Sequence, residues 1–524
     1  MPTLAPTPSL TRPSWIVLVA LLLAGSAWWI WFRLYSKVTL EDAFITYRYA
    51  TNLALGKGFV FNEGERVLGT TTPLLTLILA CFGRLVSVDA IPRFSSVAMV
   101  LLGITTGGLS YVVARKLGLQ TIAGPASVVL FFGSSRITVG AVGGMETPLV
   151  LFFMALSLYL LLAGEYTWCA VVGGLLVLTR IDGAIWFTML LVAIYVKDRR
   201  NAWKGIALST ALLLPWLVFS RLYFGSVLPN SVAAKGVLGS IQLPPLLSFA
   251  DLKLFSHWYS ASLGYGIRSW VFPIWLGFVI LGIVRLTSDS RTRLAGVVLT
   301  VFPAALGLFM YFGHAPHFDW YPSPALWTVV LLCAVGVGAS EAWLRDVLRR
   351  RQFAEWPTGV LMVCLAVAYV VSQNHGLADY YYRAQANEDT TRRSVGLWLR
   401  DKTRNDSVVA MEAIGYQGFF CERRVVDLGG LVTPEVVAIG QRSRSNAEAF
   451  GRILARFKPD YVVLRCFEVE ENRHFYGGRL FESAAERDSF VGLYGEAARF
   501  GVPYPEVWSG VSCLTILERR HDAS

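Results

Sequence analysis

The sequence predicts a polytopic α-helical membrane protein with a small α/β domain at its C-terminal end. Of the 524 residues, 54% are hydrophobic and only 16% are charged, and the mean hydropathy is +0.51. An ordinary soluble protein does not have this composition. From about residue 374 onward the long apolar runs stop, and short β-rich runs take their place. We therefore expect a membrane domain at 1–373 and a soluble domain at 374–524.

Eleven apolar runs have the length and composition of membrane spans. They cover residues 15–32, 94–114, 121–139, 148–163, 167–179, 183–196, 205–223, 269–284, 295–312, 324–344 and 357–372. The first run ends in "WWIWF" without a small-residue cleavage site, so we expect it to remain as an anchor. A further run, 74–91, contains Arg84 and Asp89. We interpret it as a re-entrant or juxtamembrane helix.

The net charge of +11 follows the membrane topology and does not indicate nucleic acid as a partner. With eleven spans, the basic clusters in the connecting segments all fall on one side, which the charge-bias rule assigns to the cytoplasm. These clusters are Arg12, Arg115/Lys116, Lys197/Arg199/Arg200/Lys204, Arg285/Arg291/Arg293 and Arg345/Arg349/Arg350/Arg351. The soluble domain and the polar motifs then share the extracytoplasmic side. The motifs are "EDAFITY" (41–47), "GGMETP" (143–148), "TRIDG" (179–183), "FGSVLPNSVAAK" (224–235) and "HAPHFDWYP" (314–322).

The soluble domain combines one clear helix with several short strands. Ser445 and Glu448 have capping-box spacing at the start of 445–458, whose apolar residues recur at helical spacing. Strands are expected at 407–411, 424–428, 460–464 and 512–517. Cys421, Cys466 and Cys513 lack metal-type spacing and allow at most one disulfide among themselves.

Glu41 and Asp42 are adjacent acids immediately outside the first span. One interpretation is structural, because Thr39 and Asp42 have capping-box spacing before a helix that Gly56 closes. The other is catalytic: low-dielectric surroundings raise the pKa of at least one carboxyl group and make it a competent general base. A cap needs only one of the two acids.

The later motifs also allow two interpretations each. Glu146 is either a helix N-terminal acid before Pro148 or a functional carboxylate. Arg180 and Asp182 either pair to close a turn, or Arg180 is a partner for an anion. Lys235 is either a solvated lysine or a cation of the site. In "HAPHFDWYP", His314, His317 and Asp319 suit hydrogen bonding to a phosphate or sugar as well as they suit a metal.

The stretch "EDAFITYRYATNLALGKGFVFNEGERVLGTTTPL" (41–74) resembles the first extracytoplasmic loop of GT-C membrane glycosyltransferases. It is most similar to the AftB-like, terminal arabinofuranosyltransferase branch, and "METP", "TRIDG", "FGSVLPNSVAAK" and "VVDLGGLVTPE" (425–435) look like further signatures of it. That branch commonly has Asp-Asp where this chain has Glu41-Asp42, and often Gly-Tyr-Thr where this chain has Gly69-Thr70-Thr71. The second departure leaves the sugar open, with arabinofuranose as one candidate.

The resemblance implies a GT-C-like fold and an inverting glycosyltransferase in a bacterial cytoplasmic membrane. Its donor would be a polyprenyl-phosphate sugar, and its acceptor a cell-envelope glycan, a glycolipid or a protein on the extracytoplasmic face. The physical requirements agree, because in-line displacement needs a base for the acceptor hydroxyl and cations for the departing phosphate. The C-terminal domain would cover the cavity and help select the acceptor.

Residue roles follow from this resemblance. Asp42 is the expected base, Glu41 supports it, and Glu146 orients the acceptor or the donor. Lys235, Arg180 and His317 are the candidate partners of the donor phosphate. Further substrate-binding candidates are Tyr47, Arg48, Asp182, Asp319 and Tyr321. Glu41, Asp42, Glu146 and His317 could also hold Mg²⁺ or Mn²⁺, and the sequence does not decide whether a metal takes part.

Two other classes of function remain open from the sequence. A transporter or flippase of a lipid-linked sugar is the main alternative, although transporters usually keep ionisable residues near the bilayer midplane and often contain paired repeats. Here the acids concentrate at the outer edge. The third class is a non-catalytic assembly protein whose soluble domain binds partners.

Overall fold

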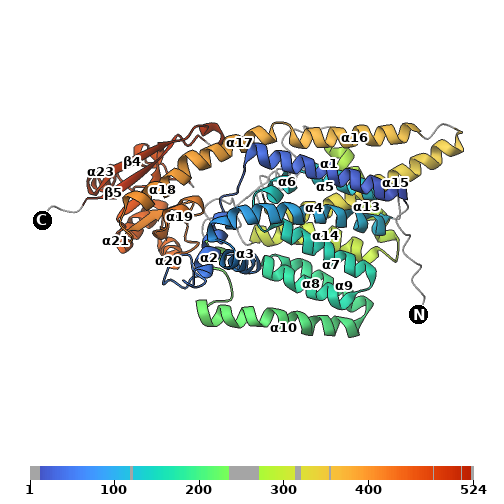
Figure 1. The fold of residues 1–524 in the computed structure, drawn as a ribbon, viewed down its shortest axis with the longest axis horizontal. Helices are drawn as coiled ribbons and strands as arrows, with labels where there is room; N and C mark the ends of the chain where they lie inside the picture. The colour runs from blue at the N-terminus through green and yellow to red at the C-terminus, as the bar shows by residue number, and fades with distance from the viewer. Residues whose placement is uncertain are drawn as a thin grey trace.

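The computed structural model describes residues 12–118, 122–234, 271–312, 320–352, 356–475, 477–508 and 510–520. An elongated bundle of helices carries an α/β domain at one end, and α17 (Leu377–Asn387) leads from the bundle into that domain (Figure 1). The short helices α2 (Ala43–Ala54) and α3 (Pro73–Leu85) lie at the same end. The predicted architecture, a helical membrane part followed by a small sheet domain, is confirmed.

Helices cover the predicted apolar runs as far as the described residues extend. They are α1 (Arg12–Ser36), α4 (Ile91–Gly118), α5 (Ala123–Gly133), α6 (Ser135–Val142), α7 (Thr147–Ala163), α8 (Tyr166–Thr179), α9 (Gly183–Lys197), α10 (Arg199–Phe224), α13 (Val271–Ser288), α14 (Arg293–Phe312), α15 (Ser323–Arg350) and α16 (Trp356–Asn374). Among the described residues, the helical segments long and apolar enough to cross a bilayer are Trp15–Ser36, Val88–Gly118, Arg199–Phe224, Arg293–Phe312 and Ser323–Arg350. Several of the other apolar helices are shorter. The number of eleven crossings therefore stays a prediction.

The run at 121–139 differs from the expected single helix. It forms α5 and α6, which meet at an angle of 65°. The bend is supported by α16, from which the Asn374 side chain donates to the Gly133 carbonyl (2.8 Å) and the Tyr369 hydroxyl donates to the Leu130 carbonyl (3.3 Å). Unpaired carbonyls are costly in a bilayer. These two side chains thus replace helical hydrogen bonds that the bend removes.

The ambiguous run at 74–91 forms α3 and the 3₁₀ turn η1 (Val88–Ala90). Helix α3 begins at Pro73 and has 13 residues, which corresponds to about 20 Å and falls short of a hydrocarbon core of about 30 Å. It exposes Leu77, Ile78 and Leu85. A short, partly apolar-faced helix at the domain end of the bundle is what the juxtamembrane interpretation expects.

The soluble domain is a five-stranded mixed sheet with helices around it. The strand order is β2 (Arg424–Asp427), β1 (Val408–Met411), β3 (Tyr461–Arg465), β5 (Cys513–Arg519), β4 (Tyr494–Gly501). Strands β2, β1 and β3 are parallel, while β5 runs antiparallel to both β3 and β4. All four expected strands are present, and β4 is an addition that the sequence pattern did not indicate.

The remaining elements of this domain are short helices. They are the π-helical turn η2 (Glu388–Arg392), α18 (Arg393–Lys402), α19 (Tyr416–Cys421), α20 (Pro434–Arg442), α21 (Asn446–Phe457), α22 (Cys466–Glu470), α23 (Ala484–Leu493) and η3 (Pro505–Trp508). Helix α21 begins as predicted, because the Ser445 hydroxyl accepts from the Glu448 backbone N–H at 3.0 Å. The capping box at 445–448 therefore identified this helix correctly.

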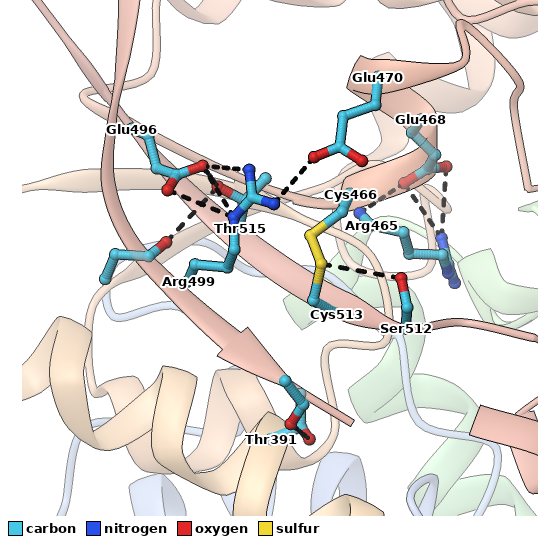
Figure 2. The surroundings of a disulfide bond; sticks show 12 residues. Thr391, Arg465, Cys466, Glu468, Glu470, Glu496, Arg499, Ser512, Cys513 and Thr515 are labelled. Atoms are coloured by element: carbon cyan, nitrogen blue, oxygen red, sulfur yellow. Dashed lines mark hydrogen bonds and ion pairs between the residues drawn. A yellow bond between two sulfur atoms is a disulfide. The ribbon is translucent and has the colours of Figure 1, made fainter. Parts of the chain in front are cut away.

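A disulfide joins Cys466 to Cys513 and leaves Cys421 as a buried free thiol. Figure 2 shows this bond between α22 and β5, with the Arg465–Glu468 pair on one side and Arg499 between two glutamates on the other. It closes a loop with a sequence separation of 47 residues.

Removing this disulfide is expected to destabilise the soluble domain. Replacing both Cys466 and Cys513 by alanine frees the unfolded chain from the constraint of this 47-residue loop, and we expect a loss of about 4 kcal/mol. Thermal unfolding of the variant and of the wild type, each with and without dithiothreitol, measures the effect. The reductant should shift only the wild type, and equal midpoints for the oxidised wild type and the variant would contradict the prediction.

The soluble domain and the loop after α2 share one hydrophobic core. Tyr49 and Phe61 from the membrane part pack in the same buried cluster as Val395, Val409 and Ile414 of the domain. Arg48, also buried, ties the two parts together by donating to the backbone carbonyls of Phe61 (2.8 Å), Gly418 and Arg423 (2.7 Å). The first loop is therefore fixed against the domain on both its apolar and its polar side.

Candidate active site

The adjacent acids Glu41 and Asp42 lie between α1 and α2, where both side chains are partly exposed. Asp42 occupies the N-cap position of α2, but its side chain makes no capping hydrogen bond. The capping box expected from Thr39 and Asp42 is absent, since the backbone N–H of Thr39 donates instead to the Gln385 side chain at 2.8 Å. The Asp42 carboxylate is thus left available for chemistry.

Glu41 is held by the soluble domain. Its Oε1 atom accepts from the backbone N–H of Gly415 at 2.5 Å. Burial raises the pKa of Glu41 well above its usual range, and the negative charge of Asp42 and a side-chain hydrogen bond between the two carboxyl groups raise it further. Burial and the neighbouring acid therefore favour the protonated form of Glu41.

Glu146 is brought beside this acid pair by a glycine-rich turn. The backbone N–H of Leu40 donates to the Gly143 carbonyl at 3.0 Å, and the Tyr47 hydroxyl donates to the Gly144 carbonyl at 2.9 Å. Glu146 precedes α7 without making a side-chain cap, and it is only 5% exposed. Burial raises its pKa, Arg180 opposes this shift, and Asp42 is one of the charges that reinforce it.

Arg180 and Asp182 form the pair that the turn interpretation expected. The Nε and Nη2 atoms of Arg180 donate to the two carboxylate oxygens of Asp182, at 3.0 and 2.5 Å. The Nη1 atom lies 3.9 Å from the Glu146 carboxylate and has no hydrogen-bond partner among the described residues. The guanidinium carbon also lies 5.7 Å from the ring centre of Tyr321. Arg180 therefore does more than close a turn, because it joins three motifs.

The other expected site residues have varied positions. Tyr47 is fully buried and orders the turn before Glu146. Arg48 directs its donors to the backbone carbonyls of the domain contact. Lys235, His317 and Asp319 lie outside the described residues, as does His314. Within the described part of the chain, no group of three or more His, Cys, Asp or Glu residues is arranged to hold a metal ion.

The remaining two motifs of the resemblance meet at Asn230. Its backbone N–H donates to the Leu68 carbonyl at 2.7 Å, and its side chain donates to the Gly430 carbonyl at 2.6 Å. The loop that contains Gly430 is closed by Asp427, whose carboxylate accepts from the backbone N–H groups of Gly429 (2.8 Å) and Val432 (3.2 Å). The 425–435 motif therefore has a structural role, because it contacts Asn230 and so holds the soluble domain against the membrane part.

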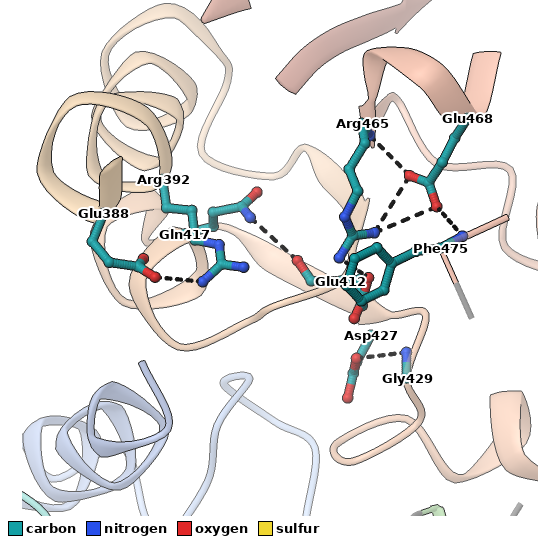
Figure 3. A network of polar contacts seen from close by, with 9 residues as sticks. All are labelled: Glu388, Arg392, Glu412, Gln417, Asp427, Gly429, Arg465, Glu468 and Phe475. Atoms are coloured by element: carbon teal, nitrogen blue, oxygen red, sulfur yellow. Dashed lines mark hydrogen bonds and ion pairs between the residues drawn. The ribbon is translucent and has the colours of Figure 1, made fainter. Parts of the chain in front are cut away.

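A cavity of about 1330 Å³ lies mainly in the soluble domain. Neither acid lines it, but the lining residues Ala413 and Gln417 flank Gly415, whose backbone N–H donates to Glu41. The soluble domain provides most of its wall, including Glu412, Gln417 and Arg465, and Ala234 contributes from the chain just before Lys235. Arg465 pairs with Glu412 at 2.6 Å and stacks on Phe475, with 3.6 Å from the guanidinium carbon to the ring centre (Figure 3). Sequence reasoning missed these residues, because no spacing pattern connects 412, 417 and 465.

Glu388, close to this cavity, makes stability depend on pH. Burial raises its pKa to about 7 from an ordinary 4.5, while Arg392 opposes and Asp389 reinforces the shift. The folded state therefore holds a proton that the unfolded state releases, and stability falls as pH rises from about 4.5 to about 7. We expect Glu388→Gln to flatten this fall by up to about 3 kcal/mol. Melting temperatures of both proteins between pH 4.5 and 8 test this, and parallel curves would contradict it.

Comparisons with known proteins agree with this fold. A family model described as "Domain of unknown function (DUF8728)" matches residues 378–512. The terminal beta-(1->2)-arabinofuranosyltransferase of Mycobacterium tuberculosis (strain ATCC 25618 / H37Rv) is 25% identical over 249 residues, which cover 43% of this chain. The match spans only 38% of that relative's length. It points to the same branch as the resemblance in the first loop.

Two solved structures match nearly the whole chain. They are crystal structures of ArnT from Cupriavidus metallidurans. The structure bound to undecaprenyl phosphate has a TM-score of 0.56, 12% identity and coverage of 98% of this chain and 99% of that chain. The apo structure has a TM-score of 0.58, 12% identity and coverage of 96% and 97%. At this identity the likeness concerns the fold, and it establishes that the chain has the ArnT-like GT-C fold that the resemblance implied.

Proposed function

We propose that this protein is an inverting glycosyltransferase that uses a polyprenyl-phosphate sugar as donor. The observation that carries the proposal is the Glu41–Asp42 pair, in which the Asp42 side chain makes no capping hydrogen bond and Glu41 is held by the backbone N–H of Gly415. A cavity large enough for a saccharide is lined by Ala413 and Gln417, on either side of the Gly415 that holds Glu41. Clefts of this kind, lined by a few polar groups with perturbed pKa values, are typical of substrate sites.

The reaction assigns each group a role. Asp42 accepts the proton of the acceptor hydroxyl as its oxygen attacks the anomeric carbon of the donor sugar. The bond between that carbon and the phosphate oxygen breaks, and its electron pair leaves with the polyprenyl phosphate. A single displacement inverts the anomeric configuration. Glu41 supports Asp42 through the hydrogen bond between the two side chains, and Glu146 orients one of the two sugars.

The departing phosphate needs positive charge, and fixed cations can supply it. We propose Arg180 for this role, through its Nη1 atom, which has no hydrogen-bond partner in the described part of the chain. Lys235, which follows the cavity residue Ala234, and His317 complete the proposed phosphate site. We place Asp182, Asp319 and Tyr321 around the sugars, because Asp182 and Tyr321 already contact Arg180.

We propose that the protein lies in a bacterial cytoplasmic membrane with its active site and soluble domain on the extracytoplasmic side. The Cys466–Cys513 disulfide supports this placement, since such bonds persist in oxidising compartments and are rare in the cytosol. The bias of the basic clusters toward the opposite side supports it too. The acceptor is then a glycan, a glycolipid or a protein of the cell envelope, with arabinofuranose as one candidate sugar.

An assay in proteoliposomes tests the proposal. The purified protein is reconstituted with a panel of polyprenyl-phosphate pentoses and hexoses and with envelope glycan fragments as acceptors. We expect acceptor-dependent release of polyprenyl phosphate and a product of inverted anomeric configuration, both observable by mass spectrometry and NMR. Movement of the intact lipid-linked sugar across the bilayer without cleavage would instead identify a flippase.

A further inference from the structure

Arg392 and Gln417 both line the wall of the cavity. Arg392 is the last residue of η2, a π-helical turn between α17 and α18. Such turns often occur at functional sites, because the wider turn changes the direction of the side chains that follow it. Figure 3 shows Glu388, Arg392 and Gln417 on the same side of the network that also contains Glu412 and Arg465.

The guanidinium group of Arg392 is fixed on two sides. Its Nη1 atom donates to the Oε1 atom of Glu388 at 2.6 Å, and its plane lies over Trp508, with 4.4 Å to the ring centre. The Arg392 side chain remains 19% exposed. A guanidinium group has five N–H donors. Among the described residues, Arg392 uses one of them, in its hydrogen bond to Glu388. Its other N–H groups can donate to a ligand in the cavity.

Gln417 presents an unused acceptor. It is 2% exposed, and its amide nitrogen donates to the Glu412 carbonyl at 3.2 Å. If the Gln417 amide were flipped, its oxygen would face the Glu412 carbonyl oxygen and the hydrogen bond would be lost. The orientation of the amide is therefore defined by this contact. Its Oε1 atom has no hydrogen-bond partner in the described part of the chain. Buried acceptors without partners are rare and costly, and because Gln417 lines the cavity, a ligand bound there can satisfy this one.

These groups lie next to the proposed reaction centre. Gly415, whose N–H donates to Glu41, directly precedes α19, and Gln417 is in the first turn of that helix. The positive charge of Arg392 also acts on Glu41, whose pKa it lowers against the larger effect of burial. A molecule that contacts Gln417 and Arg392 can therefore extend a group toward Asp42.

We propose that Arg392 and Gln417 form a subsite for the hydroxyl groups of the acceptor saccharide, with Glu388 holding Arg392 in place. This inference rests on the proposed function and names the part of the cavity that binds the acceptor. The chemistry selects hydroxyl groups over phosphate: a sugar hydroxyl donates to Gln417 Oε1 and accepts from Arg392, whereas an ionised phosphate has no proton to donate to Gln417. The subsite therefore belongs to the acceptor and not to the donor phosphate.

Kinetics of two variants test this subsite. Gln417→Met and Arg392→Met keep the approximate length of the side chain and remove its hydrogen bonding. We expect the KM for the acceptor to rise about tenfold or more in each variant, with an unchanged KM for the polyprenyl-phosphate sugar. Arg393→Met is the matched control, because Arg393 is the exposed neighbour of Arg392 and does not line the cavity. An unchanged acceptor KM, or a change in the donor KM alone, would overturn the inference.

A binding measurement separates this inference from the proposed function. Saturation-transfer NMR with neutral oligosaccharides detects binding without catalysis. If the wild type transfers no sugar but binds an oligosaccharide that Gln417→Met does not bind, the subsite stands and the proposed reaction fails. If the wild type transfers sugar and both variants bind and use the acceptor normally, the subsite fails and the proposed reaction stands. If Arg392→Met does not fold, Gln417→Met alone decides.

Discussion

Asp42→Asn is expected to reduce sugar transfer by about 10²- to 10⁴-fold, the range that a positioned general base contributes. Asparagine has nearly the same size but cannot take the proton of the acceptor hydroxyl. Because the Asp42 side chain makes no capping hydrogen bond, the substitution should leave the fold of α2 intact. Donor binding should also persist, since the phosphate partners are unchanged.

Glu63→Gln provides the control for this experiment. Glu63 is another acid of the first loop, but it is exposed and pairs with Lys57 at 3.1 Å. Initial rates of transfer, titration of donor binding and melting temperatures should be measured for both variants beside the wild type. Transfer by Asp42→Asn within a factor of about 3 of the wild-type rate would remove Asp42 from the role of base.

Arg48→Met is expected to cost about 3 kcal/mol of stability. The substitution takes the guanidinium donor from the buried Arg423 carbonyl, and a buried unpaired group costs about 1–3 kcal/mol. The carbonyls of Phe61 and Gly418 also lose a hydrogen bond, although Asn52 Nδ2 (3.0 Å) and the Cys421 thiol (3.4 Å) still donate to them. It also removes the stacking of the guanidinium on Phe61, at 4.2 Å. The protein should then melt at a lower temperature, by about 5–10 °C.

The matched control is Arg66→Met. Arg66 is exposed and lies over the ring of Tyr223 at 4.7 Å, so it also loses a stacking contact but leaves no buried carbonyl unpaired. Differential scanning fluorimetry in the same detergent compares the two variants. Equal melting temperatures would show that the polar contacts of Arg48 do not hold the loop and the domain together.

The sequence predicted those features that depend on local patterns. Apolar runs identified the membrane helices, and the Ser445–Glu448 spacing located the start of α21, because capping and periodicity involve only neighbouring residues. The strand β4 was not predicted, since "YGEAARFG" lacks the β-branched residues typical of strands. Its pairing with β5 makes it a strand. The bend between α5 and α6 was missed because no proline marks it and its hydrogen-bond partners lie in α16.

Some residues of the candidate site could also be predicted from local sequence patterns, and others could not. Glu41, Asp42, Glu146 and Arg180 could be selected from the sequence, because charged groups beside an apolar span are conspicuous. The hydrogen bonds of Arg48 to the soluble domain could not be predicted from the sequence, because its partner Gly418 lies 370 residues further along the chain. Gln417 and Arg392 were missed for a similar reason: nothing in their sequence neighbourhood indicates the cavity that they line, whose walls come from segments far apart in the sequence of the soluble domain.

The buried cluster that includes Tyr49 from one part and Ile414 from the other has a practical consequence for dissecting this protein. A chain shortened after residue 373 would present bare aromatic side chains to water and lose the amide that holds Glu41, so the truncated enzyme should aggregate and work poorly. The isolated C-terminal fragment would face the same difficulty from its own side. Biochemists who want to study either portion will need to keep both polypeptide segments together.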